Sequence, residues 1–380
     1  MNELYIGLMS GTSLDGIDAV LVDFCQDAPR LIGNHAQTIP NVLRTQIQQL
    51  CDAELPANEI NQMGAVDRQI GLLFAEAVLT LCKQSGVSPK DIKAIGSHGQ
   101  TIRHYPNGHD QQGLSPNKQH GFTLQIGDAN TIAVQTGIDV VADFRKKDVA
   151  LGGQGAPLVP AFHQYVFGDK SVDRMIVNIG GMANLTFLPA QREQQVTGYD
   201  TGPGNTLLDG WCIRHTNQPY DKDGSWGRSG ELNQALLQRL LGDDYFTQAS
   251  PKSTGREKFN LSWLEAILGD QSMPVQDVQA TLVHLSAISI ADEIKQITNK
   301  GDVYLCGGGS RNGYLVETIA LYLNEFEVMN TEVLGVNPDW VEAIAFAWLA
   351  RAYVLKQPGN MPSVTGASRA AVLGCYFPFA

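Results

Sequence analysis

The sequence contains no long hydrophobic run and no cysteine motif. No stretch of about 18 apolar residues occurs, so no membrane-spanning helix is expected. The six cysteines are scattered without a C-x-x-C pair, which argues against a zinc ribbon and against a disulfide framework. Residues 1–4 lack the basic and apolar regions of a signal peptide, and the sequence therefore predicts a cytoplasmic protein with reduced thiols.

Positive charge is scarce, and two common phosphate-binding motifs are missing. The chain carries 27 Lys and Arg against 39 Asp and Glu, a formal net charge of −12. Such a surface repels nucleic acid phosphates and anionic lipids, so neither a polynucleotide nor a membrane is an expected partner. The sequence has no G-x-x-x-x-G-K-[ST] and no G-x-G-x-x-G after a strand, so any nucleotide must be bound in another way.

The composition is that of an ordinary globular protein. Of the 380 residues, 43% are hydrophobic and 17% are charged. At about 150 residues per domain, this length predicts two domains, with the ligand site expected between them.

A strand, a Gly/Ser/Thr loop and a second strand occur twice in the chain. Residues 4–8 and 17–24 are rich in β-forming residues and flank the loop 10–16. The arrangement returns at 175–179 and 185–188, around Gly180 and Gly181. Two domains of similar design are therefore expected.

The remaining patterns alternate between strands and helices, which is typical of α/β layers. The predicted strands are 92–95, 123–126, 138–142 and 303–306, and the predicted helices are 70–83, 278–298, 314–326 and 341–355. The last helix is apolar on most of its surface and is expected to be buried between domains. The polar stretch 104–121 is expected to be a surface loop.

Three glycine-rich turns are candidates for binding a nucleotide. Backbone N–H and hydroxyl groups of the first loop suit phosphate oxygens, although Asp15 would need a Mg²⁺ between its carboxylate and a phosphate. The alternative is an ordinary hairpin turn with Asp15 as a turn residue. The second hairpin suits the same phosphates, and the glycines after strand 303–306 admit a flat group. The candidates are Ser10, Gly11, Thr12, Ser13, Leu14, Asp15, Gly16, Gly180, Gly181, Gly307, Gly308 and Gly309.

Asp200 is the candidate general base. It lies in a glycine-lined stretch, 198–205, that is predicted to form a stiff turn before a helix. A fixed carboxylate suits proton abstraction, which requires placement within about 3 Å of the attacking group. The alternative role for Asp200 is that of a helix N-cap or an Asx-turn residue.

Two polar stretches are candidates for binding a small substrate. Residues 96–101 follow a strand and include Gln100 and Thr101, whose side chains suit sugar hydroxyls or an amide, whereas His98 alone is more often structural. Residues 145–147 place three cations beside the glycine-rich stretch 152–155, where they would hold an anionic group. The alternative is a solvated surface cluster. No histidine pair has the spacing of a zinc site.

Taken together, these features resemble the superfamily of sugar kinases, actin and heat-shock chaperone ATPases. The whole chain resembles more closely the anhydro-N-acetylmuramic acid kinase family of bacterial cell-wall recycling. The motifs that carry this resemblance are residues 7–16, 96–101, 139–145, 152–160, 178–181, 200–205 and 306–309.

The resemblance implies an α/β fold of two duplicated actin/hexokinase-like, or ribonuclease H-like, domains with ATP and sugar in a cleft between them. The expected domains are 1–138 with 358–380, and 139–357 including the interdomain helix. The implied reaction uses ATP and water to convert 1,6-anhydro-N-acetylmuramic acid into N-acetylmuramic acid 6-phosphate.

The resemblance also implies roles for individual residues. Asp200 would deprotonate the attacking water, the first loop and Mg²⁺ would hold the phosphates of ATP, and residues 307–309 would lie near the adenosine. The substrate would face Gln100, Thr101, Arg145, Lys147 and Glu342. For Glu342 the alternative is a plain acidic residue in a first helical turn. No metal ligand is predicted, and a homodimer is implied.

Three other functions remain open from the residues alone. A kinase for a free sugar hydroxyl would use Asp200 as a simple base. An ATP-driven clamp or filament protein would share the hairpins but need no sugar site. A metal-dependent carbamoyltransferase relative would need clustered histidine and carboxylate ligands, which the spacing does not support.

Overall fold

The computed structural model describes residues 3–11, 14, 16–26, 28–51, 58–108, 121–191 and 193–380. It divides into two compact units, which we call unit 1 (Met1–Phe162 with Trp340–Ala380) and unit 2 (His163–Asp339). The chain passes from unit 1 to unit 2 between residues 162 and 163 and returns between residues 339 and 340. The sequence predicted these domain boundaries at 138 and 357 instead. Thr12, Ser13, Asp15 and most of the predicted surface loop 104–121 lie outside the described residues.

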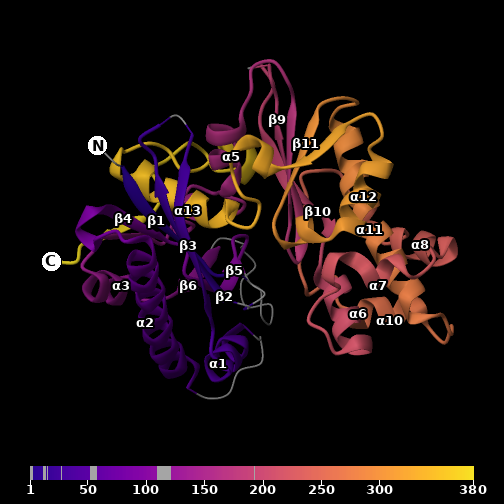
Figure 1. The fold of residues 1–380 in the computed structure, drawn as a ribbon, viewed down its shortest axis with the longest axis horizontal. Helices are drawn as coiled ribbons and strands as arrows, with labels where there is room; N and C mark the ends of the chain where they lie inside the picture. The colour runs from indigo at the N-terminus through magenta and orange to yellow at the C-terminus, as the bar shows by residue number, and fades with distance from the viewer. Residues whose placement is uncertain are drawn as a thin grey trace. The chain divides into compact units, whose positions relative to one another are not determined.

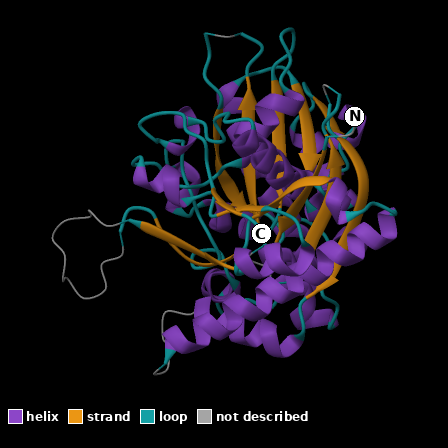
Figure 2. Cartoon of the chain, turned by 90° about the vertical axis from the view of Figure 1, so that its left-hand side faces the viewer, coloured by secondary structure: helices purple, strands orange, loops and turns teal. Residues whose placement is uncertain are grey.

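Unit 1 is built on a six-stranded sheet and a separate two-stranded ribbon. Its strands are β1 (Leu4–Met9), β2 (Gly16–Asp23), β3 (Arg30–Thr38), β4 (Ile92–Ser97), β5 (Gln100–Tyr105), β6 (Phe122–Ile126), β7 (Val140–Ala142) and β13 (Cys375–Phe377). Its helices are α1 (Asn41–Cys51), α2 (Glu59–Ser85), η1 (Pro89–Asp91), α3 (Ala129–Thr136), α4 (Lys146–Ala150), α13 (Val341–Val354) and α14 (Pro362–Thr365), while α5 (Val159–Phe167) crosses into unit 2. Figure 2 shows this mixture of strands and helices.

Unit 2 is built on a five-stranded sheet. Its strands are β8 (Arg174–Ile179), β9 (Met182–Leu188), β10 (Thr197–Pro203), β11 (Asp302–Cys306) and β12 (Glu327–Asn330). Its helices are α6 (Thr206–Thr216), η2 (Lys222–Gly224), α7 (Ser225–Arg228), α8 (Gln234–Leu241), α9 (Asp244–Thr247), α10 (Leu261–Leu268), α11 (Val275–Ile297), η3 (Gly308–Arg311), α12 (Gly313–Tyr322) and η4 (Thr331–Leu334). No helix in the described part of the chain has the length and apolar character needed to cross a membrane.

Five strands follow the same order in both large sheets: β3-β2-β1-β4-β7 in unit 1 corresponds to β10-β9-β8-β11-β12 in unit 2. In unit 1 the order is β13-β7-β4-β1-β2-β3, and in unit 2 it is β10-β9-β8-β11-β12. In unit 1, β1 pairs antiparallel with β2 and parallel with β4. In unit 2, β8 likewise pairs antiparallel with β9 and parallel with β11. The prediction of an α/β fold with two units of the same design is confirmed.

Helix α13 packs against the central strands of unit 1, as Figure 1 shows. Two glycines permit this contact, because a Cβ on Gly7 would overlap the carbonyl oxygen of Ala343 and a Cβ on Gly96 that of Phe346. Side chains alternate along a strand, so Ile6 and Leu8 point to the opposite face, where they join the core formed with α2. Burial on both faces explains why β1 is apolar along most of its length.

Candidate functional site

Ser10 lies at the end of β1 and is almost fully buried. Its hydroxyl donates to Oε1 of Gln100 at 2.7 Å, so the first hairpin is tied to the start of β5. Leu14 is buried with a φ of 59°, and the N–H of Leu14 donates to the carbonyl of Gly11. Hydrogen bonds therefore tie the described residues of this loop to one another and to β5.

His98 connects this hairpin to Arg145. Nε and Nη2 of Arg145 lie 3.2 and 2.9 Å from Nε2 of His98, and a guanidinium only donates, so Nε2 must accept. Nδ1 therefore carries the proton and donates to the carbonyl of Ser10 at 3.2 Å. Burial, and then the charge of Arg145, lower the pKa of His98 to about 3, which keeps the ring neutral.

Arg145 also reaches the glycine-rich stretch. Its Nη1 donates to the carbonyl of Gly155 at 2.8 Å. Burial lowers the pKa of Arg145 to about 10, and the nearby charges of Glu342 and Asp148 oppose that shift. The structure therefore brings together Gln100, Arg145 and Glu342, three of the residues predicted to face the substrate.

Asp148 organises this region and was missed by the sequence analysis. It is fully buried, and its carboxylate accepts from the N–H of Gly155 at 2.8 Å, from Asn360 at 2.7 Å and from Thr365 at 2.8 Å. The available signal was an aspartate that directly follows the three basic residues and shortly precedes Gly152. Asp148 fixes the loop whose carbonyl Arg145 contacts.

Thr101 and Lys147 have different surroundings. The hydroxyl of Thr101 accepts from Nε2 of Gln125 at 3.2 Å, on the β5–β6 ribbon. Lys147 is exposed, and its ammonium donates to the carbonyl of Val372 at 2.8 Å. Lys146 is exposed too and pairs with Asp143. The basic run thus divides into Arg145, which joins the His98 network, and two surface lysines.

The glycine turns of unit 2 pack closely against neighbouring backbone. The carbonyls of Gly180 and Gly181 accept from the N–H groups of residues 204–206. A Cβ on Gly181 would lie 2.8 Å from Oγ1 of Thr206 and 3.6 Å from Nη2 of Arg256. Gly307 has a φ of 78°, and a Cβ on Gly309 would overlap Ile179. Gly181, Gly307 and Gly309 therefore have no room for a side chain without rearrangement, whereas a Cβ on Gly180 would make only an ordinary contact.

Asp200 lies on β10, where the predicted stiff turn is wrong. Opposite β9, Asp200 pairs with Asn184 and Gly202 with Ala183, so Thr201 is an extra residue and forms a bulge. The N-cap interpretation is also wrong, because α6 begins at Thr206 and Asn205 is its N-cap residue. A bulge next to a functional side chain changes the direction in which that side chain points.

The environment of Asp200 suits a base. Oδ2 accepts from the hydroxyl of Ser253 at 2.9 Å and from the N–H of Thr254 at 3.1 Å. Burial raises the pKa of Asp200, the two hydrogen bonds lower it, and the charge of Glu257 raises it. A carboxylate whose pKa is raised is a better proton acceptor than an ordinary one.

The comparisons with known proteins agree over the whole chain. A family model described as "Anhydro-N-acetylmuramic acid kinase" matches residues 3–379. A protein of that name from Shewanella pealeana is 52% identical over 379 residues, covering 99% of both chains. Another from Shewanella sp. (strain ANA-3) is 53% identical over 380 residues, again covering 99% of both. The chain belongs to the anhydro-N-acetylmuramic acid kinase family.

Two solved structures share little sequence with this member of the kinase family. An activator of 2-hydroxyisocaproyl-CoA dehydratase from Clostridium difficile is 12% identical with a TM-score of 0.46, covering 91% of this chain and 93% of that one. A ROK family glucokinase from Streptomyces griseus is 14% identical with a TM-score of 0.40, covering 92% and 99%. Both TM-scores lie below 0.5, so neither similarity indicates the substrate of this chain.

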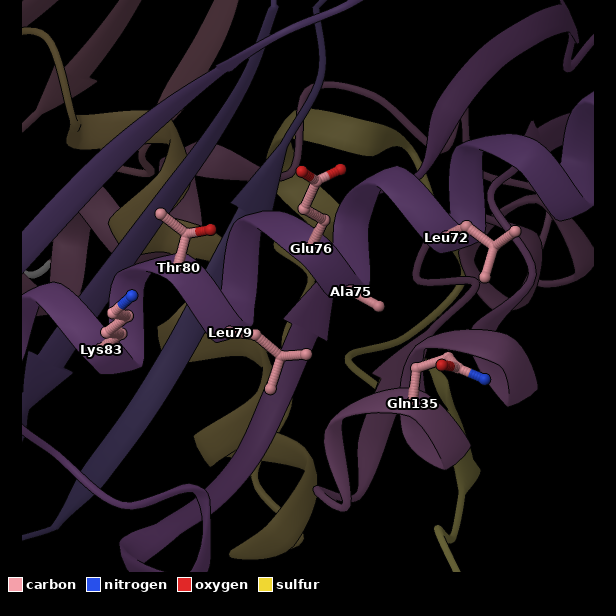
Figure 3. A pocket seen from close by; sticks show the side chains of 7 residues that line it. All are labelled: Leu72, Ala75, Glu76, Leu79, Thr80, Lys83 and Gln135. Atoms are coloured by element: carbon pink, nitrogen blue, oxygen red, sulfur yellow. The ribbon is translucent and has the colours of Figure 1, made fainter.

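Two cavities lie in the described part of unit 1. A cavity of about 330 Å³ between α2 and α3 contains none of the predicted site residues. Figure 3 shows its lining: Leu72, Ala75, Glu76, Leu79, Thr80, Lys83 and Gln135. A second cavity, of about 170 Å³, includes His98 and Gly99 in its lining. Within the described ranges, no group of three or more His, Cys, Asp or Glu side chains is arranged to hold a metal ion.

Proposed function

We propose that this chain uses ATP and water to convert 1,6-anhydro-N-acetylmuramic acid into N-acetylmuramic acid 6-phosphate, with Asp200 as the general base, as part of cell-wall recycling. Family membership supports the kinase activity and the substrate class. The observation that carries the assignment of the base is the half-buried carboxylate of Asp200, which is held through one oxygen and has a raised pKa.

The chemistry of the substrate explains why a base is needed for water. In the anhydro sugar O6 is bonded to C1 and carries no proton, so a base acting on a 6-hydroxyl would have nothing to remove. Water instead attacks C1, and Asp200 takes a proton from that water. The C1–O6 bond breaks, O6 forms a bond to the γ-phosphorus of ATP, and ADP leaves. The products are the 6-phosphate, ADP and one proton.

The substrate-binding roles follow the contacts in unit 1. Arg145 has N–H groups beyond those that contact His98 and Gly155, and these suit the lactyl carboxylate of the sugar. Gln100, Thr101 and Glu342 would hold hydroxyl or amide groups of the sugar. Lys147 was expected to do the same, but its bond to Val372 leaves it at most a supporting electrostatic role.

The proposed ATP-binding residues lie in glycine-containing turns. The first loop, with Ser10 at its start, and the second hairpin, with Gly180 and Gly181, would bind phosphates, and residues 307–309 would lie near the adenosine. Mg²⁺ would be carried mainly by the phosphates. When bound, Mg²⁺ neutralises charge on the phosphates. Location in the cytoplasm and assembly as a homodimer are further parts of the proposal, supported by the family resemblance.

The test is analysis of the product by mass spectrometry. Wild-type protein, Asp200→Asn and Asp270→Asn are incubated with Mg·ATP, the anhydro sugar and ¹⁸O-water. Asp270 is an exposed acidic residue of the same unit and provides the control. We expect one ¹⁸O at C1 of the 6-phosphate, a rate loss of about 10²- to 10⁴-fold for Asp200→Asn, and no loss for the control.

Two other results would contradict the proposal. Release of ADP while the anhydro sugar is recovered unchanged would make the chain another ATPase. Phosphorylation of the ring-opened sugar alone would make it a kinase for a free hydroxyl.

A further inference from the structure

The segment Ser250–Glu257, which we call the clamp segment, lies against the backbone and the side chain of Asp200. The N–H of Asp200 donates to the carbonyl of Lys252 at 3.0 Å, and the hydroxyl of Tyr245 donates to the carbonyl of Asp200 at 2.7 Å. The Ser253 hydroxyl and the Thr254 N–H both bind Oδ2. Among the described residues no donor binds Oδ1, so the two carboxylate oxygens have different surroundings.

A buried ion pair anchors the clamp segment. Nζ of Lys252 lies 2.6 Å from Oε1 of Glu293 on α11, and both side chains are at most 4% exposed. The Ser250 hydroxyl donates to the other oxygen of Glu293 at 2.7 Å. Breaking such a pair leaves an uncompensated buried charge, which is strongly unfavourable. The segment is therefore anchored directly before Ser253 and Thr254, the two residues that contact the carboxylate of Asp200.

We propose that the clamp segment positions the catalytic base: Ser253 and the Thr254 amide fix Oδ2 of Asp200, so that Oδ1 is the oxygen that receives the proton from water. Ser253 is a positioning residue, because it acts through Asp200. This inference rests on the proposed function, in which Asp200 is the base. It assigns a role to a stretch in which the sequence analysis found no candidate.

The charges around Asp200 make the inference testable. The facing groups are Tyr245 on α9, Glu293 on α11, and Lys252 and Glu257 in the clamp segment. Ser253 stabilises the carboxylate form by a hydrogen bond, whereas Glu257 destabilises it by repulsion. Removing Ser253 must therefore raise the pKa of Asp200, and neutralising Glu257 must lower it.

The experiment compares Ser253→Ala, Ser253→Thr and Glu257→Gln in the full chain. For Ser253→Ala we expect kcat to fall about ten- to a hundredfold and the acidic limb of the kcat/KM profile to move to higher pH. Ser253→Thr keeps the hydroxyl and should restore both. Glu257→Gln should move the limb to lower pH. Ser272→Ala, an exposed serine of the same unit, is the control and should match wild type.

The inference would be overturned if the acidic limb of the kcat/KM profile stayed in place in Ser253→Ala and Glu257→Gln, or moved in the same direction in both. A merely structural role of Ser253 would lower the amount of folded protein without moving the limbs in opposite directions. Glu257 is exposed, so Glu257→Gln tests the electrostatic part even where Ser253→Ala folds poorly.

A second measurement separates this inference from the proposed function. The carboxyl carbon of Asp200 is titrated by ¹³C NMR in selectively labelled protein, with Asp200→Asn identifying the signal. Opposite shifts of its midpoint in the two variants would support the clamp segment even where wild type fails to consume the anhydro sugar. If the protein consumes the anhydro sugar but the titration midpoint of Asp200 is unchanged in both variants, the role of the clamp segment is contradicted and the proposed function still holds.

Discussion

Arg145 is held by two acceptors at once, Nε2 of His98 and the carbonyl of Gly155. The planar guanidinium suits this arrangement, because its N–H groups point in fixed directions and some remain for a bound carboxylate. His98 accepts from Arg145 only in its neutral form. The lowered pKa of His98 keeps its ring neutral, so that the ring can accept from Arg145 and hold the guanidinium in place.

We expect Arg145→Lys to raise the KM for the anhydro sugar about ten- to a hundredfold. A single ammonium cannot serve both acceptors and also bind a carboxylate through two bonds, and a lost hydrogen bond to a charged group costs about 1.5–3 kcal/mol. The KM for ATP should stay unchanged. Steady-state kinetics with each substrate varied in turn measure both values.

Lys147→Met is the matched control for this prediction. Lys147 is exposed and donates to the carbonyl of Val372, so its replacement should change the KM for the sugar about twofold at most. An equal rise in both variants would show that the whole basic run acts on the substrate through its charge.

At the level of elements, helix α13 stabilises the sheet of unit 1 from a distant part of the chain. Its approach depends on strand positions without a side chain, since Gly7 and Gly96 face carbonyl oxygens of the helix. Phe346 of α13 also packs on the ring of His98, with ring centroids 4.8 Å apart. The helix thus supports the strands and the candidate substrate site together.

We expect Gly96→Ala to lower the free energy of unfolding by about 3 kcal/mol, because its Cβ would overlap the backbone of Phe346 and force the strand and the helix apart. Gly64→Ala is the control, since a Cβ there meets nothing within 4 Å and lies in helix α2. It should stabilise by about 0.5–1 kcal/mol. Urea unfolding of both variants checks this, and equal stability of the two would contradict the close packing of α13.

At the level of the whole molecule, each unit has its own hydrophobic core and contains a buried histidine with a strongly lowered pKa. His98 in unit 1 and His163 in unit 2 both have a pKa lowered to about 3, in each case chiefly by burial. Unfolded imidazoles titrate near pH 6.5. Below that pH the unfolded chain binds protons that the folded chain excludes, so acid must favour unfolding.

We expect the free energy of unfolding to fall as the pH is lowered from 6.5 to 5. Each histidine contributes up to about 1.4 kcal/mol per pH unit in this window, and nothing above it. Urea unfolding at pH 7.5, 6.0 and 5.0 measures the slope. His163→Gln should reduce that slope by the share of one histidine. A stability that is constant or higher at pH 5 would contradict the burial of neutral imidazoles.

Local features of the sequence determined the two hairpins and the general fold. Strands β1, β2, β8 and β9 lie within a few residues of their predicted positions, because β-forming runs and turn residues are read over short stretches of chain. The sequence also identified Asp200 and Arg145 as candidates from residue type and neighbouring glycines.

Only the tertiary structure decided how those residues are held. Asp200 meets Ser253 across 53 positions, and Arg145 meets His98 across 47. A hydrogen bond between such distant residues leaves no periodic pattern in the sequence, so neither partner was predicted. The bulge in β10 and the packing of α13 in unit 1 depend in the same way on pairing between remote segments, whose register is set by the assembled core.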